Sequence, residues 1–398
     1  MDRPTAVSAG RPFLRSALSA PSPFGWQLCR FCILPVIALL LACPRCPSQD
    51  RRKVIIDQDE AGPAGTDLQS TLLLIQSPQT EVLGITVVTG DMWLREEVAH
   101  TLRMLELIGR TDIPVVPGAE YPLVRTKEET ELWEQQYGRV GYLGAWTPRI
   151  YHPADQVGEL KEGNPKTKPV QEDAAHFLVR TVRQFPNQVT IYAGGPMTNV
   201  ALAISIDPEF PSLVKEFVFM GASLSPQTDD PEFVNLPRHE FNLWFDPEAA
   251  HIMLRAKWKK IVCTPVDISV KTAMTQELLD RIKAADTPAA RYISKYTVVR
   301  KYGYLWDELA AVAWLDPSII TKKETRFMDV DLDRGAGYGS VLTWAAEDRP
   351  KVEVRPIEIQ VDLDTQKFYK MIVDLLSAAT PPKAASRSRM AAPVVAAK

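Results

Sequence analysis

Short apolar runs alternate with longer segments of helical periodicity along most of this chain. The apolar runs predict strands at residues 54–56, 81–88, 113–116, 189–193, 216–220 and 260–265. Apolar positions three and four residues apart predict helices at residues 68–76, 93–108, 171–184, 197–204, 247–254, 276–285, 289–301, 306–315 and 368–376, and residues 352–361 predict a late antiparallel strand. This alternation indicates an α/β fold: a single large domain over residues 50–378, with a mostly parallel, Rossmann-like central sheet flanked by helices.

Residues 119–169 interrupt the alternation. They lack clear periodicity and are rich in Tyr, Trp, Gly and Pro, so we expect no regular structure there. So long an irregular segment is more often a functional loop or lid than a simple connection. A mobile surface insertion is the alternative. Tyr137, Tyr142 and Trp146 are the aromatic residues that a lid would place over a ligand.

The first 49 residues differ from the rest of the chain. Several arginines precede an apolar run at residues 31–43, which is too short to span a bilayer easily but suits a secretory signal. The Leu-Leu-Ala-Cys sequence that ends at Cys43 looks like a bacterial lipobox, in which the cysteine carries a lipid anchor. We therefore expect an exported bacterial protein, either periplasmic or a membrane-anchored lipoprotein. The tail at residues 379–398, rich in Ala, Pro and Ser, is expected to be disordered.

Four of the five cysteines lie in the first 49 residues, as the pairs Cys29–Cys32 and Cys43–Cys46. Two Cys-x-x-Cys pairs usually suggest zinc, but the residues between these pairs are nearly all aliphatic and unsuited to a hydrated zinc ribbon. Only Cys263 remains in the domain, so no internal disulfide framework is expected. Cys263 is predicted to be a small core residue.

The overall charge narrows the choice of partners. The formal net charge is -3 over 398 residues, and 45% of the residues are apolar. No basic patch dominates the sequence, so nothing predicts a nucleic-acid partner.

Carboxylates crowd the end of the first predicted strand. Asp57 and Asp59 follow its apolar residues, and Asp67 follows a Gly/Pro-rich loop at the start of the next helix. Open α/β sheets bind ligands at the carboxyl ends of their strands. Like charges that lie close together repel one another unless a cation sits among them, and hard oxygen ligands favour Ca²⁺ or Mg²⁺. A metal site is the first interpretation, and an Asp-rich turn that caps a helix is the alternative.

Further polar groups follow other predicted strands. If the strand ends meet at one edge of the sheet, these groups would surround a cation and a polyhydroxylated ligand. They are Asp91, the carbonyl of Ala193, Glu240, Asn242 and Asp307.

The motifs at these positions resemble those of the nucleoside hydrolase family, the inosine-uridine-preferring type. The family opens with a strand and an Asp-x-Asp-Pro-Gly-x-Asp-Asp cluster. Here Asp57-Gln58-Asp59 matches the first half of that cluster, and Thr66-Asp67 stands at its end. Residues 194–201, GGPMTNVA, look like the family's Gly-Gly-x-x-Thr-Asn segment, and residues 240–250, EFNLWFDPEAA, are similar to a further hallmark. The resemblance covers about residues 53–376, with the motifs in order.

The resemblance implies a Ca²⁺-dependent enzyme that hydrolyses the N-glycosidic bond of ribonucleosides or related N-ribosides through an oxocarbenium-like state. It implies that Asp59 is the base that activates water and also a metal ligand. The remaining protein ligands of the metal would be Asp67, Asp307 and the Ala193 carbonyl. The substrate would be held by Asp91, Glu240, Asn242 and Trp306, and Asp57 would orient the loop from behind. The family also implies a homodimer or homotetramer.

Three positions depart from the family pattern. Thr66 replaces the first Asp of the terminal pair, and Asp91 stands where the family has Asn. Trp306 stands where many members have a His that protonates the departing base. An indole does not donate a proton as an acid, but it can stack on a purine. His239, next to Glu240, is the one histidine that we considered for the site.

These departures keep a second hypothesis open, namely a catalytically impaired protein of the same fold that binds a metal and a nucleoside or sugar. A third hypothesis, a phosphotransferase of the haloacid dehalogenase type, rests on the apolar strand before Asp57-x-Asp59. Those enzymes need Thr or Val two residues after the second Asp, where this chain has Ala61. No second or third motif of that class supports it.

Overall fold

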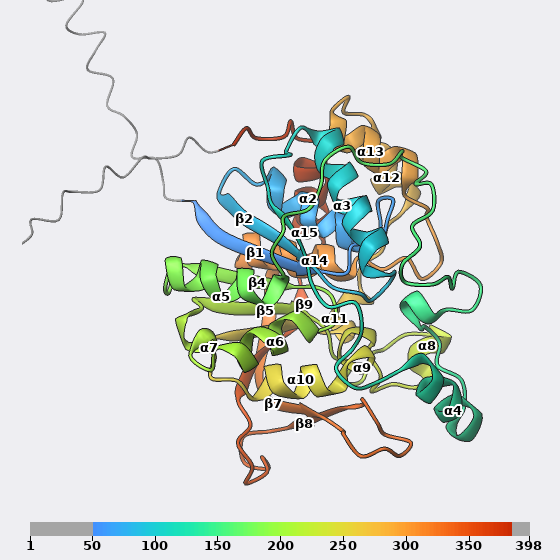
Figure 1. Ribbon diagram of the computed structural model, residues 1–398, viewed down its shortest axis with the longest axis vertical. Helices are drawn as coiled ribbons and strands as arrows, with labels where there is room; N and C mark the ends of the chain where they lie inside the picture. The colour runs from blue at the N-terminus through green and yellow to red at the C-terminus, as the bar shows by residue number, and fades with distance from the viewer. Residues whose placement is uncertain (1–50, 384–398) are drawn as a thin grey trace, which may run out of the picture. The chain divides into compact units, whose positions relative to one another are not determined.

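The structure is a computed structural model that describes residues 51–383 (Figure 1). Within these residues a nine-stranded sheet has the order β3-β2-β1-β4-β5-β6-β9-β7-β8. The strands are β1 (Arg52–Gln58), β2 (Thr80–Val87), β3 (Val115–Pro117), β4 (Val189–Ala193), β5 (Glu216–Met220), β6 (Ile261–Thr264), β7 (Ile320–Val330), β8 (Val341–Trp344) and β9 (Pro356–Leu363). The expectation of an α/β fold with a mostly parallel sheet is confirmed, since β1 to β6 pair in parallel.

Most of the longer helices lie where the sequence predicts them, and α4 and several short helices are additions. The longer helices are α2 (Thr66–Gln76), α3 (Leu94–Ile108), α4 (Lys127–Tyr137), α5 (Ala174–Gln184), α6 (Thr198–Ile206), α10 (Pro247–Arg255), α12 (Gln276–Lys283), α13 (Pro288–Tyr296), α14 (Trp306–Leu315) and α15 (Thr365–Leu376). The short ones are α7 (Phe210–Leu213), α8 (Pro231–Asn235), α9 (Phe241–Phe245), α11 (Val266–Ser269) and the 3-10 turns η1 (Gly144–Trp146) and η2 (Pro317–Ile319).

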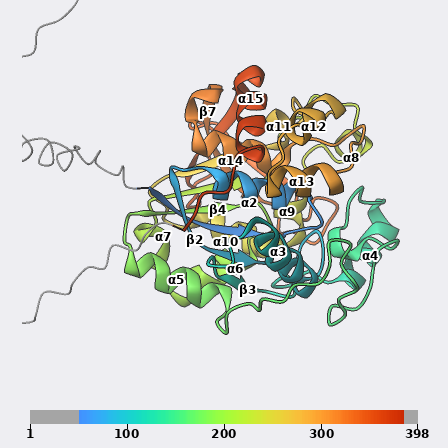
Figure 2. The same ribbon diagram turned by 90° about the horizontal axis from the view of Figure 1, so that it is seen from above.

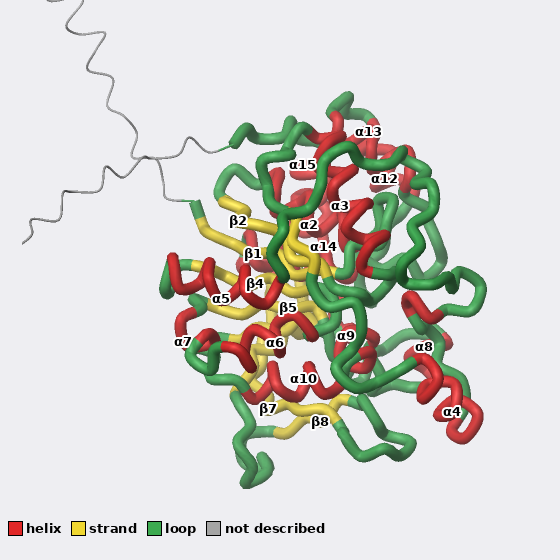
Figure 3. The backbone as a smooth tube through the Cα atoms, in the orientation of Figure 1, coloured by secondary structure: helices red, strands yellow, loops and turns green. Residues whose placement is uncertain are grey.

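The two faces of the sheet carry different helices (Figures 2 and 3). Side chains on neighbouring positions of β1 point to opposite faces. Val54 and Ile56 join the core formed with α2, α14 and α15, whereas Ile55 joins the core formed with α5, α6 and α10. The sheet is therefore buried on both faces, which explains why its central strands are apolar runs rather than alternating patterns.

The far edge of the sheet differs from the sequence prediction. Residues 352–361 were expected to form an antiparallel strand, but β9 pairs in parallel with β6 and antiparallel only with β7. Strands β7 and β8 were not predicted. The first half of β7 carries Lys322, Lys323 and Glu324 on exposed or partly exposed positions, so it lacks the apolar run that marked the central strands.

The prediction that residues 119–169 lack regular structure was wrong, because this segment contains α4 and η1. Thr126 caps α4, and its hydroxyl accepts a hydrogen bond from the Glu129 N–H. Thr130 is the single buried residue of α4, so this solvated helix has no apolar stripe that the sequence could reveal. The predicted helix at 289–301 ends earlier, at Tyr296.

Several predictions about the chain ends lie outside the described residues. These are the signal segment with its four cysteines, the lipid anchor at Cys43 and nearly all of the tail after residue 378. Cys263 is buried in β6, as predicted for a small core residue. Between residues 51 and 383, no helix is long and apolar enough to cross a bilayer.

Candidate active site

The predicted site residues meet at the carboxyl edge of the central strands. Asp57, near the end of β1, lies between Thr86 of β2 and Ala193 of β4 in the ladder. Asp59 follows β1 directly, and Asp91 follows β2. The convergence expected from the sequence is therefore present, because β1 has these two strands as its neighbours.

Asp59 is buried between two glycines. A Cβ atom at position 90 would lie 2.1 Å from Asp59 Oδ2, and one at position 195 would lie 2.7 Å from Oδ1. The Asp91 backbone N–H donates a hydrogen bond of 3.0 Å to Asp59 Oδ2. Asp59 Oδ1 is buried and has no hydrogen-bond partner. Only glycine lets two backbone segments come this close to the carboxyl group.

Asp67 and Asp307 stand in the first turns of α2 and α14. Both side chains are buried, and each keeps one oxygen without a hydrogen-bond partner, Oδ2 in Asp67 and Oδ1 in Asp307. A Cβ at position 194 would lie 2.6 Å from Asp307 Oδ1, so the backbone just after β4 also borders this group. The helix starts thus deliver two carboxyl groups beside Asp59.

The electrostatics of these groups reflect burial and mutual repulsion. Burial raises the pKa of Asp59 and of Asp67 well above the usual range, and the charges of Asp91 and Asp307 raise both further. Burial raises the pKa of Asp307 to about 7, although Asp67 and Gln58 offset this in part. Burial raises the pKa of Asp91 to about 6, partly offset by Tyr142. All four groups ionise together only if positive charge enters the site.

The donor chemistry fits a hard cation. The three unpartnered carboxyl oxygens of Asp59, Asp67 and Asp307 are buried acceptors, and buried acceptors without partners are costly. Oxygen ligands of this kind are those that Ca²⁺ and Mg²⁺ prefer. Within residues 51–383, however, no three His, Cys, Asp or Glu side chains already converge in the arrangement of a metal site. The residues therefore fit a cation by chemistry, without a closed coordination shell.

Asp57 lies on β1, two residues before Asp59, and was predicted to orient the loop that carries the candidate metal ligands. Its Oδ1 accepts hydrogen bonds from the Thr86 hydroxyl and from the Asn199 side-chain amide. Burial raises the pKa of Asp57 to about 6, against the effect of these two bonds. Asn199 also accepts from the Ala119 N–H, so Asp57 connects β1, β2 and the start of α6 to the segment after β3.

Glu240 was predicted to bind the substrate, and its carboxyl group is largely engaged with the backbone. Oε1 accepts from the Asn242 N–H, and Oε2 accepts from the Ala222 and Leu243 N–H groups, so Glu240 caps α9. Burial raises its pKa to about 7. Asn242 donates its side-chain amide to the Gly194 carbonyl at 2.5 Å, which holds α9 against the end of β4.

Two of the departures from the family pattern have a clear structural setting. The Thr66 hydroxyl donates a hydrogen bond to the buried Glu308 carboxyl at 2.5 Å and so joins α2 to α14. Trp306 opens α14 and packs against Phe233 of the α8 segment, with ring centroids 5.8 Å apart, and against Tyr304 at 4.8 Å. Trp306, Phe233 and Tyr304 therefore form an aromatic wall, and Trp306 is not an acid that could donate a proton.

The 119–169 segment reaches the site through residues 142–145. The Ala145 N–H donates to the Gly90 carbonyl at 2.9 Å, directly beside Asp59. Tyr142 faces Asp91 and packs edge-on against Phe241 at 5.0 Å. Trp146 is buried against Phe245, and Tyr137 is 40% exposed. Of the three aromatic residues expected to cover a ligand, only Tyr142 borders the carboxyl groups.

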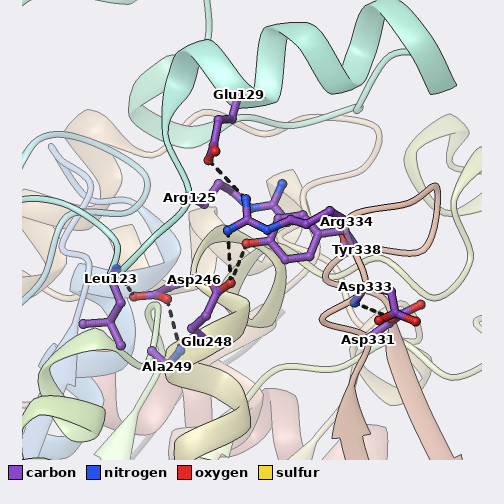
Figure 4. A network of polar contacts seen from close by, with 10 residues as sticks. All are labelled: Leu123, Arg125, Glu129, Asp246, Glu248, Ala249, Asp331, Asp333, Arg334 and Tyr338. Carbon is purple, nitrogen blue, oxygen red and sulfur yellow. Dashed lines mark hydrogen bonds and ion pairs between the residues drawn. The ribbon is translucent and has the colours of Figure 1, made fainter.

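This segment is anchored from outside by the β7–β8 hairpin (Figure 4). The ring of Tyr338 lies between two guanidinium groups, with Arg125 at 4.1 Å and Arg334 at 4.7 Å from its centroid. Its hydroxyl donates to Glu248 of α10 at 2.7 Å, and Arg334 reaches Glu129 of α4 at 3.3 Å. The hairpin, absent from the sequence prediction, thereby joins α4 to the main domain.

Three acidic residues at the site were missed by sequence reasoning. Glu60 and Glu97 are buried, and each has one carboxyl oxygen without a partner. Glu60 directly follows Asp59, which was an available signal, whereas Glu97 looks like any acid in the first turn of a helix. Glu232, on α8, interacts with the charges of Glu240 and Asp91. Its segment carried no recognisable pattern.

His239 is buried but is not joined to the carboxyl groups by a hydrogen bond. Its ring packs against Trp244 at 4.6 Å, and both ring nitrogens lack a partner. Burial and the charge of Arg125 lower its pKa to about 3. The side chain is therefore neutral at physiological pH and sits in an aromatic and cationic environment.

Comparison with known proteins finds relatives that match most of this chain. The sequence model of the inosine-uridine preferring nucleoside hydrolase family matches residues 54–370. An uncharacterized protein of Schizosaccharomyces pombe is 31% identical over 82% of this chain and 85% of its own length. A probable uridine nucleosidase of Arabidopsis thaliana is 28% identical over 82% of this chain and 98% of its own. A solved plant nucleoside hydrolase, PpNRh1, shares the fold with a TM-score of 0.65 at 23% identity, over 82% and 99% of the two chains.

Proposed function

This chain belongs to the inosine-uridine preferring nucleoside hydrolase family and is an N-glycosyl hydrolase, and we propose that it hydrolyses ribonucleosides in a Ca²⁺-dependent reaction. One observation carries the proposal. Asp59, Asp67 and Asp307 present buried, unpartnered carboxyl oxygens at the carboxyl edge of the sheet. Such a group needs a cation, and it lies beside the substrate-binding candidates Asn242 and Asp91.

Asp59 is the proposed base. Its Oδ1 has no hydrogen-bond partner among residues 51–383, so it can accept a proton from an attacking water, while the Asp91 N–H holds Oδ2 in place. The water adds to the anomeric carbon of the ribose as the glycosidic bond to the nucleobase breaks. The surrounding acidic groups stabilise the positive charge that develops on the sugar.

The cation would be held by Asp59, Asp67, Asp307 and the Ala193 carbonyl, and Asp57 would keep their loop in position. When bound, Ca²⁺ would offset the repulsion among these carboxylates and hold hydroxyl oxygens of the ligand. Asn242 is positioned to contact the sugar, since its amide nitrogen is held by the Gly194 carbonyl. Trp306 is suited to pack on the base, because it lies in an aromatic wall with Phe233 and Tyr304.

A binding protein without turnover is the second candidate. It is favoured by Thr66, whose hydroxyl is committed to Glu308 and adds no carboxylate to the site, and by Trp306, which offers no acidic proton. Ligand binding without release of ribose would distinguish this role from hydrolysis.

The direct test is release of ribose from a panel of nucleosides that includes uridine and inosine, with and without a chelator. We expect release that the chelator abolishes and that Asp59→Asn lowers by about 10²–10⁴-fold, the usual contribution of a general base. Asp286→Asn, which removes an acid whose side chain is 90% exposed, is the matched control. Failure to release ribose from any nucleoside by folded, Ca²⁺-loaded protein would refute hydrolysis.

We also propose that the chain is exported, with Cys43 as a lipid anchor, and that it forms a homodimer or homotetramer. The apolar run at residues 31–43 and the lipobox-like sequence support the first proposal. Membrane fractionation of the wild type and Cys43→Ser tests it, and light scattering of the purified protein tests the second.

A further inference from the structure

Protonation of the departing base assists the hydrolysis of a nucleoside. When the bond between the anomeric carbon and the base nitrogen breaks, the electron pair stays on the base, and an unprotonated base leaves as an anion, which is the poorer leaving group. Three other side chains near the site are poor proton donors for this step. Trp306 has no acidic proton. Burial and Asp91 raise the pKa of Tyr142 well above 10, and the His239 ring is neutral.

Glu232 is the second residue of α8, a helix outside the carboxyl cluster. Its side chain packs against Gly141, where a Cβ would lie 3.0 Å from Glu232 Cγ. Tyr142, next along the chain from Gly141, faces Asp91. This contact holds Glu232 beside the part of the 119–169 segment that covers the site.

The neighbours of Glu232 anchor its segment to the aromatic wall. Phe233 packs on Trp306 with ring centroids 5.8 Å apart. Thr228 and Tyr304 share a hydrogen bond of 2.8 Å between their hydroxyl groups, and Asp230 caps the segment by accepting from the Glu232 N–H. The segment of Glu232 therefore contacts the 119–169 segment at Gly141 and the aromatic wall at Trp306.

Glu232 is partly buried, and no hydrogen bond from residues 51–383 stabilises the ionised form of its carboxyl group. Among the described residues, the charges that shift its ionisation are acidic: Asp230 from its own segment, Glu240 from the start of α9 and Asp91 from the loop after β2. Burial and these charges raise the pKa of Glu232 to about 7. A carboxyl group in such surroundings keeps its proton near neutral pH and can give it up.

We propose that Glu232 is the catalytic acid that protonates the departing base, an inference that rests on the proposed hydrolase function. The Glu232 proton passes to a nitrogen or oxygen of the base as the glycosidic bond breaks, and the bonding pair goes to the base. The attacking water forms the new bond to the anomeric carbon and loses its proton to Asp59. Solvent then returns a proton to Glu232 and takes one from Asp59, so the products are neutral base and ribose.

The test compares two substrate types in the wild type and in Glu232→Gln. Protonation of the leaving group accelerates the cleavage of uridine and inosine, whereas 4-nitrophenyl β-D-ribofuranoside releases a more stable phenolate that leaves readily without it. We expect Glu232→Gln to lower kcat/KM for nucleosides by about 10²–10⁴-fold, the usual range for a general acid. Its rate on the nitrophenyl riboside should remain close to that of the wild type. Glu232→Asp, which keeps an acid, should recover part of the loss.

The pH profile provides a second readout. The acid works only while protonated, so wild-type kcat for nucleosides should fall as the pH rises above about 7. This fall should disappear in Glu232→Gln and for the nitrophenyl riboside. Asp229→Asn is the matched control, because it removes an acid with a 78% exposed side chain from the same segment.

Several outcomes would overturn the assignment. Glu232→Gln could retain full activity on nucleosides. Alternatively, its activity could fall equally on nucleosides and on the nitrophenyl riboside, which would indicate a merely structural role. A wild type that cleaves the nitrophenyl riboside but no nucleoside would also contradict an effective acid at Glu232. A wild type that cleaves neither substrate would instead refute the proposed hydrolase function, and the assignment with it.

Discussion

The hydroxyl group of Thr66 donates a hydrogen bond of 2.5 Å to the Glu308 carboxyl and joins the first turns of α2 and α14. Asp67 and Asp307 are the adjacent residues on the two helices. The bond therefore sets the distance between the two helix starts that carry candidate metal ligands. Thr66 thus supplies a contact between two helices and adds no carboxyl group to the site.

Thr66→Val should lower the free energy of unfolding by about 1–3 kcal/mol, because it leaves the buried Glu308 carboxyl without its partner. Urea denaturation of both proteins measures the difference. Thr321→Val, on an exposed position of β7, serves as the control and should have little effect. Equal stabilities for wild type and Thr66→Val would show that the bond contributes nothing.

Ca²⁺ should stabilise the folded protein independently of any activity. A ligand that binds only the folded state at about 100 times its Kd adds about 2.7 kcal/mol. Thermal denaturation with Ca²⁺ and with chelator measures this. Asp67→Asn should remove most of the shift, whereas Asp286→Asn should preserve it. If the melting temperature of the wild type is the same with Ca²⁺ and with chelator, there is no cation site among these carboxyl groups.

Gly90→Ala should impair activity while the fold persists. The added Cβ would meet Asp59 Oδ2 at 2.1 Å, so the carboxyl group must move. A displacement of about 1 Å at a reacting group can cost about 10²-fold in rate, and we expect a loss of that order in kcat/KM. Gly158→Ala is matched, since no atom lies within 4 Å of its Cβ position. Activity that survives in Gly90→Ala would place the reacting group elsewhere.

Asp329 should make a pH-dependent contribution to stability. It accepts hydrogen bonds from His251 and Arg255 of α10. Burial alone would raise the pKa of Asp329, but these bonds outweigh it and lower the pKa below its usual value. The stabilisation is therefore present above the unfolded pKa of about 3.9 and is lost as the pH falls through the lower folded value.

The variant Asp329→Asn measures this contribution. We expect it to lower the free energy of unfolding by about 1–3 kcal/mol at pH 7, with the difference shrinking below about pH 4. Urea denaturation across this range provides the data, with the exposed Asp348→Asn as control. A difference that is independent of pH would exclude the charge of Asp329 as its cause.

The sequence alone determined the central architecture and most of the candidate site. Strands buried on both faces are apolar runs, and the residues that follow them must share one edge of a parallel sheet. Asp59, Asp67, Asp91 and Asp307 could therefore be placed together without coordinates. The sequence carries this information because the hydrophobic period of a strand or a helix is visible within a few neighbouring residues.

Tertiary structure decided what no local pattern expresses. The exposed helix α4 and the charged strand β7 have little apolar periodicity. The hairpin that carries Arg334 and Tyr338 contacts the rest of the domain through Arg125, Glu129 and Glu248, which are distant in the sequence. Glu97 and Glu232 look like solvated acids in the sequence. Their burial beside the site depends on distant segments folding over them, and burial is what gives such acids their chemistry.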